Sequence, residues 1–225
     1  MKKLLLILLI SSQAFSEKLI HVSEYIDGIN DRVLKNASIV VGDDGRIKSI
    51  SSGFKNSNGY QYIDLRDYMV MPGLMDMHVH FGQQNTSKAD KPEKVEKEYS
   101  AIAAVKHARM TLDGGFTTVR QVGDSGFIAI SLRDAITNGD AIGPRIFAAG
   151  KSLATTGGHA DPTNGRAFGD YVYPDPESGV VNGPYEVFAG VRQRYKDGAD
   201  GIKITVTGGV MSLAKSGDNP QFTQE

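Results

Sequence analysis

Two histidines stand one residue apart, His78 and His80, at the end of the apolar run MPGLMDMHVHF of residues 71–81. Residues two apart on a β-strand point to the same side, so the two imidazoles would lie together. Two neutral imidazoles can bind one divalent ion at about 2.0–2.1 Å, and Asp76 would share their face and could tune such a site. The alternative is a chance pair of half-buried histidines, since five histidines in 225 residues give a His-x-His triplet in roughly one such sequence in ten.

A lysine inside a second apolar run, Lys203 in GIKITV, is the next candidate. On a strand, Lys203 and Thr205 would face one way and the neighbouring aliphatic residues the other. If this strand belongs to a barrel, Lys203 points into the barrel mouth, where a lone ammonium is costly and must lose its proton or find a partner. The alternative is a lysine at the edge of the strand, whose aliphatic chain lies along the protein while its ammonium stays in water.

The loop TTGGHADP contains a third candidate, His159. Its glycines would let the backbone approach a ligand closely, and His159 could hydrogen-bond a substrate carboxylate or a developing oxyanion. A loop histidine bonded to backbone is the alternative. The TGGV stretch at 207–210 is expected to line the same pocket, and Arg120 is expected to form a structural ion pair with Asp124.

Composition limits the chemistry further. The formal net charge of −1 gives no indication of a nucleic-acid or anionic-membrane partner. The sequence has no cysteine, which excludes disulfides, cysteine-based zinc sites and cysteine nucleophiles. A transition metal would therefore be held by His, Asp, Glu or a modified side chain.

The first 16 residues are expected to be a secretory signal peptide rather than part of the fold. They have a basic start, an apolar run from Leu4 to Ile10 and a small-residue site that ends at Ser16. This run is too short to span a bilayer, and a buried N-terminal strand is the alternative. We therefore expect a secreted or periplasmic protein with no membrane attachment after cleavage.

Two further regions must position the candidate residues. Residues 17–70 indicate a small, mostly antiparallel β segment, in which Asp43-Asp44-Gly45 between two β-rich runs predicts a hairpin. From residue 71 to 225, β-rich runs alternate with helices expected at 93–112, 127–139 and 183–198. This alternation predicts a parallel α/β sheet, either a barrel with its site at the carboxyl ends of the strands or a doubly wound sheet. No G-x-G-x-x-G motif follows a strand, which argues against dinucleotide binding.

Several stretches together resemble one family. YIDLRDYMVMPGLMDMHVHF is similar to the start of the barrel in the amidohydrolase superfamily, where a β-sandwich segment leads through Pro-Gly into a first strand that ends in His-x-His. GFTTVRQVGD, GPRIFAAGKSLATTGGHADP and YKDGADGIKITVTGGVMS resemble its second, third and fourth strands. The likeness is to the imidazolonepropionase-related branch, which contains Xaa-Pro dipeptidases (prolidases) and metallocarboxypeptidases. It implies a (β/α)8 metal-dependent hydrolase barrel, with its first four β/α units present in residues 71–225.

The resemblance also implies roles for single residues. His78, His80 and Lys203 match the family's metal ligands, and His159 is implied in substrate binding. Lys203 matches the lysine that reacts with carbon dioxide to form an anionic carbamate, which bridges two metal ions, expected to be zinc with manganese and cobalt as alternatives. A metal-bound hydroxide then attacks the scissile carbonyl while the metals polarise it, which makes Lys203 a catalytic residue as well.

The resemblance implies a hydrolase of C–N bonds whose partner is a small peptide or amide, and it leaves a homo-oligomer possible. We expect an Xaa-Pro-type dipeptidase or carboxypeptidase, with a cyclic amide or imidazolone hydrolase as the alternative. The family site also uses two histidines and an aspartate from later strands, yet no histidine follows Lys203. A barrel of this kind needs eight strands, so we expect the N-terminal half of a longer enzyme, and a non-catalytic half barrel is the further alternative.

Overall fold

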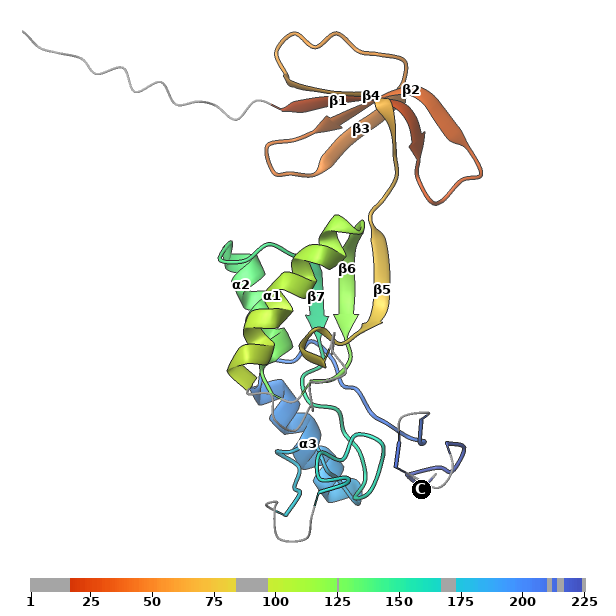
Figure 1. Ribbon diagram of the computed structural model, residues 1–225. Helices are drawn as coiled ribbons and strands as arrows, with labels where there is room; N and C mark the ends of the chain where they lie inside the picture. Colours follow the sequence, from red (N-terminus) through yellow and green to blue (C-terminus); the bar gives the residue numbers. More distant parts are fainter. Residues whose placement is uncertain are drawn as a thin grey trace, which may run out of the picture. The chain divides into compact units, whose positions relative to one another are not determined.

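The computed structural model of the chain describes residues 17–83, 97–124, 126–166, 173–209, 212–213 and 217–223. These residues form two compact units that divide between Pro72 and Gly73 (Figure 1). The expected signal peptide at 1–16 and the first four residues of the helix expected at 93–112 lie outside the described residues. In the part of the chain that is described, no helix is long and apolar enough to cross a membrane.

The first unit is a four-stranded sheet in the order β3-β2-β1-β4. Its strands are β1 (Lys18–Ile26), β2 (Val33–Val41), β3 (Ile47–Ser52) and β4 (Gln61–Val70). The pairs β1–β2 and β2–β3 are antiparallel. Gly45 takes a φ of 74° in the turn between β2 and β3, where its N–H donates to the Gly42 carbonyl at 2.9 Å. The structure thus confirms the hairpin predicted from Asp43-Asp44-Gly45, because glycine adopts this left-handed conformation without steric cost.

The fourth strand of this unit departs from the expected antiparallel arrangement. β4 pairs with β1 in parallel, with Lys18 opposite Gln61 and Leu19 opposite Tyr62. The chain leaves β3 at one edge of the sheet and returns at the other edge, so residues 53–60 make a crossover instead of a hairpin. Sequence patterns identify the strand and the loop but do not fix the edge to which a strand returns.

The second unit is built on three parallel strands in the order β5-β6-β7. The strands are β5 (Leu74–Val79), β6 (Phe116–Gln121) and β7 (Arg145–Ala148), and the helices are α1 (Lys97–Asp113), α2 (Ile128–Asn138) and α3 (Pro184–Lys196). A short 3₁₀ turn, η1 (Phe81–Gln83), follows β5. This alternation is the one predicted, and the architecture is that of a partial β/α barrel preceded by a β segment.

One face of this sheet is packed and the other is open. Val119 and Ile146 are register partners in β6 and β7, and both are buried in the core formed with α1 and α2. The next pair along, Arg120 and Phe147, is exposed on the opposite face. Figure 1 shows α1 and α2 together on one side of the three strands. The packed face fixes the strands, and the ends of these strands carry the candidate residues.

The fourth barrel strand predicted around GIKITV is only rudimentary. Ile204 makes a single parallel bridge with Leu153, supported by hydrogen bonds from Leu153 N–H to the Lys203 carbonyl at 2.8 Å and from Thr205 N–H to the Leu153 carbonyl at 2.9 Å. At the end of this stretch the Val206 carbonyl accepts from the Gln221 N–H at 2.7 Å, and Thr207 makes an antiparallel bridge with Pro220. The stretch therefore has isolated bridges to two different segments instead of one continuous ladder.

Candidate metal centre

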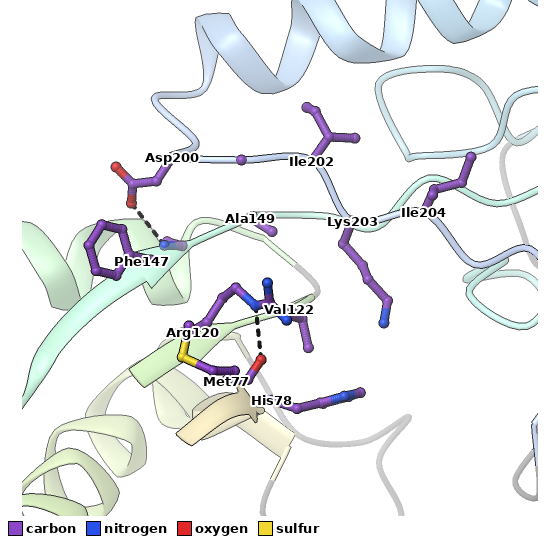
Figure 2. A pocket seen from close by; sticks show the side chains of 12 residues that line it. Met77, His78, Arg120, Val122, Phe147, Ala149, Asp200, Ile202, Lys203 and Ile204 are labelled. Carbon is purple, nitrogen blue, oxygen red and sulfur yellow. Dashed lines mark hydrogen bonds between the residues drawn. The ribbon is translucent and has the colours of Figure 1, made fainter. Parts of the chain in front are cut away.

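His78 and His80 are adjacent in space at the carboxyl end of β5. Their Nε2 atoms lie 3.2 Å apart, and their rings meet edge to face with centroids 5.1 Å apart. His78 borders an open cavity of about 560 Å³. The cavity is lined by Met77 and His78 from β5, Arg120 and Val122 from the end of β6, residues 147–149 from the end of β7, and residues 200–204 (Figure 2).

The ring of His80 is held in one tautomer. Its Nδ1 lies 3.0 Å from the carbonyl oxygen of Gly123. A carbonyl can only accept a hydrogen bond, so Nδ1 carries the proton and donates it, and in the neutral ring Nε2 keeps its lone pair. That lone pair is directed toward His78. Histidine ligands to metals are commonly oriented in this way by a carbonyl on the far ring nitrogen.

His80 is followed by a residue that anchors the strand end. The side chain of Phe81 is fully buried in the core with α1 and α2. Its backbone N–H donates to Gln121 Oε1 at 2.9 Å, and its carbonyl accepts from His107 Nδ1 at 3.0 Å. The sequence pattern indicates no role for Gln121 or His107. The sequence signal for Gln121 is only its place at the end of a β-branched run.

Lys203 enters the same cavity from the segment after α3. Figure 2 shows its side chain extending toward His78. Partial loss of hydration, followed by the positive charges of Lys203 and then of His80, holds the pKa of His78 below its usual value. A lowered pKa keeps the imidazole neutral, and the neutral form is the one that binds metals.

Two carboxylates near the histidine pair, Asp200 and Asp76, have other partners than Lys203. Asp200 accepts from the Ala148 N–H at 2.8 Å and from Arg133 at 2.7 Å. Asp76 accepts from the backbone N–H of His78 at 2.9 Å, which orients the strand end beneath the imidazoles. These carboxylates hold backbone in place instead of pairing with the lysine.

The ion pair expected between Arg120 and Asp124 is wrong. Arg120 Nε donates to the Met77 carbonyl at 2.9 Å, so it ties β6 to β5 (Figure 2). Asp124 is buried and accepts from the N–H groups of Gly126 and Ala129 at the start of α2, and burial raises the pKa of its carboxyl group. Both side chains thus take backbone partners.

His159 lies outside the residues that line this cavity. Its ring Nδ1 pairs with the Ser212 hydroxyl, and its backbone N–H donates to Gln221 at 3.0 Å. Gly209 packs against the ring, since a Cβ there would lie 3.2 Å from His159 Cε1. His159 and Gly209 thus lie against each other, but neither lines the cavity at the histidine pair, and Val210 lies outside the described residues.

The histidine pair fits a divalent ion. Two ligand nitrogens at 2.0–2.1 Å from a tetrahedral ion are roughly 3.3 Å apart, and the observed Nε2–Nε2 distance is 3.2 Å. Among the described residues no three His, Cys, Asp or Glu side chains cluster as a metal site. Two imidazoles are too few for a closed site, so an ion here would need further ligands.

Gly123 is a position of this geometry that tolerates no side chain without movement of its neighbours. Its φ is 143°, and a Cβ would lie 2.5 Å from Ser152 Oγ. Gly123→Ala is expected to displace the carbonyl that orients His80 and to weaken zinc binding about tenfold, at the low end of the range for such supporting contacts. The control is Gly139→Ala, which has a φ of 83° with nothing within 4 Å of the new Cβ. Equal zinc affinity of the two variants in a competition titration would contradict the expectation.

Comparisons with known proteins show what this chain is similar to. Residues 69–225 match the Amidohydrolase family. Ochratoxinase from Aspergillus niger is 30% identical over 211 residues, which are 85% of this chain and 42% of that protein. A solved Xaa-Pro dipeptidase with methionine bound in its active site superposes with a TM-score of 0.89 and 67% identity, over 93% of this chain and 52% of that one. A prolidase complexed with N-methylphosphonate-L-proline gives a TM-score of 0.79 and 30% identity, over 92% and 51%. The chain thus spans about half the length of these relatives.

Proposed function

Because the chain belongs to the amidohydrolase family, we propose that the complete protein is a metal-dependent hydrolase that cleaves the C–N bond of Xaa-Pro-type dipeptides or of other peptides with a free carboxylate. The observation that carries this proposal is the convergence of His78, His80 and Lys203 at the carboxyl ends of parallel strands. Barrel enzymes keep their chemistry at this end.

The chain's own residues have distinct parts in this proposal. His78 and His80 would hold a divalent ion through their Nε2 atoms, and Lys203 would add oxygen ligands after carboxylation. Members of the family are generally metal-dependent, and a bound divalent ion polarises a carbonyl and lowers the pKa of water. The Gly123 carbonyl keeps the ligand nitrogen of His80 free of a proton.

The substrate class is supported by the lining of the cavity and by the relatives. Arg120, fixed by its bond to the Met77 carbonyl, brings a guanidinium to the cavity wall. A guanidinium suits a substrate with a free carboxylate, as in a dipeptide. The relative with 67% identity is an Xaa-Pro dipeptidase, and the prolidase was solved with a proline phosphonate. The guanidinium suits either class of carboxylate substrate, and these relatives favour dipeptides over cyclic amides.

The test is hydrolysis by the protein purified from its native source. We expect proline release from Xaa-Pro dipeptides, loss of this activity with a chelator and recovery with zinc or manganese. His78→Asn should lower both the metal content and the turnover. Opening of cyclic amides without dipeptide cleavage would contradict the proposed substrate class, and chelator-resistant turnover would contradict the metal-dependent mechanism.

The 225-residue chain expressed alone is the matched sample for this experiment. It carries His78, His80 and Lys203. Its zinc binding and turnover therefore show what these three residues achieve without the rest of the complete protein. We expect weak zinc binding without turnover, because two imidazoles and one modified lysine do not complete a binuclear site. Turnover by this chain equal to that of the native protein would show that no further ligands are needed.

A further inference from the structure

Gln121 is a fully buried amide in the packed face of β6. Its exposed fraction is 0%, and Val119, two residues earlier on the same face, is equally buried in the apolar core. An amide in such a position is costly unless both its oxygen and its nitrogen find hydrogen-bond partners. Both do, and each partner lies beside His80.

The two partners fix the orientation of the amide. Gln121 Oε1 accepts from the Phe81 N–H at 2.9 Å, and Gln121 Nε2 donates to the Gly123 carbonyl at 3.1 Å. A backbone N–H can only donate and a carbonyl can only accept, so the oxygen and the nitrogen cannot exchange places. The amide bridges the ends of β5 and β6.

Both contacts converge on His80. The Gly123 carbonyl that accepts from Gln121 is the one that accepts from His80 Nδ1 at 3.0 Å. Phe81, whose N–H the amide holds, is the next residue after His80. Gln121 therefore fixes the backbone behind His80 and the acceptor in front of its ring.

We propose that Gln121 is a positioning residue, which holds the Gly123 carbonyl and the Phe81 backbone so that His80 presents an unprotonated Nε2 toward His78. The consequence for metal affinity rests on the proposed hydrolase function. The tautomer itself does not, because it is a property of the metal-free chain.

The first test is nitrogen NMR of the histidine rings in the metal-free protein, at a pH where the imidazoles are neutral. In the unmodified protein the His80 ring is expected in the Nδ1–H form. In Gln121→Met, which keeps the length of the side chain and loses both hydrogen bonds, we expect a mixture of the two tautomers. An Nε2–H form in the unmodified protein overturns the proposal, whether or not the variant folds.

The second test is zinc affinity, measured by competition with a chromophoric chelator. Gln121→Met is expected to weaken zinc binding about 10- to 100-fold, the range typical of residues that orient a metal ligand. Val119→Ala is the control, since it perturbs the same buried face without touching His80. A similar loss of affinity in both variants would assign Gln121 a merely structural role. Absence of zinc binding in the unmodified protein would instead count against the proposed function, and the NMR result would still stand.

Discussion

Replacing Lys203 with alanine is expected to lower kcat/KM of the complete protein about 1,000-fold, with most of the loss in kcat. Lys203 lies in the cavity bordered by His78, where its charge already influences that imidazole. As a carbamate it would supply the anionic oxygens that help to hold the ions. Metal polarisation contributes several kcal/mol to such reactions, and about 4 kcal/mol corresponds to about 1,000-fold in rate.

The charge that Lys203 supplies can be tested by chemical rescue. The lysine ammonium first loses a proton, and the neutral amine then joins the carbon of carbon dioxide and releases a second proton, so the working side chain would be an anion. Propionate added to Lys203→Ala should therefore restore part of the activity, and propylamine should not. Rescue by propylamine alone would show that the ammonium is the working group and would refute the carbamate.

The control for this experiment is Lys196→Ala. Lys196 is an exposed lysine at the end of α3 and does not line the cavity. We expect the activity and metal content of the Lys196→Ala variant to match those of the unmodified protein. Metal content of Lys203→Ala, measured by elemental analysis, should fall in parallel with turnover.

Replacing Arg194 with methionine is expected to lower the free energy of unfolding by about 3–5 kcal/mol, the cost of removing one partner from a buried ion pair. Arg194 on α3 is 0% exposed and lies 3.1 Å from the nearly buried carboxylate of Asp197. It also donates to the carbonyls of Glu177 at 2.9 Å and Lys151 at 3.3 Å. These bonds attach both ends of the loop after β7 to α3.

Urea unfolding followed by circular dichroism measures this effect. Arg192→Met, an exposed arginine on the same helix, should change stability by less than about 0.5 kcal/mol. Adding Asp197→Leu to Arg194→Met should recover part of the loss, because it removes the carboxylate that has lost its ion-pair partner. Coincident unfolding curves for the two arginine variants would contradict a structural role for Arg194.

The sequence was sufficient for the order of strands and helices and for the proximity of the histidine pair. These follow from local rules: apolar periodicity, glycine at helix ends, and the alternation of side chains along a strand. Gly139 closes α2 in the left-handed conformation, as expected of a glycine after a helix. The placement of Lys203 beside His78 followed from the parallel alternation, which brings strand ends to one edge of a sheet.

Other features depend on contacts between distant residues, and sequence patterns did not predict them. Arg120 could reach a carboxylate or a carbonyl, and only the packed structure shows that it bonds the Met77 carbonyl. Gln121 has no distinguishing sequence pattern, although its amide has two partners next to His80. The separation of His159 from the cavity depends on the path of a long loop, for which residue patterns carry little information.

The parallel pairing of β4 with β1 has a consequence for how the first unit folds. The hairpin of β2 and β3 closes over residues 42–46, whereas His21 of β1 hydrogen-bonds Tyr62 of β4, 41 residues along the chain. Closing a longer loop costs more chain entropy and slows folding, so the hairpin should form early and the β1–β4 ladder last. During synthesis β1 must therefore wait, with an unpaired edge, until β4 has left the ribosome. A nascent chain that stops before residue 61 would expose that edge to other chains.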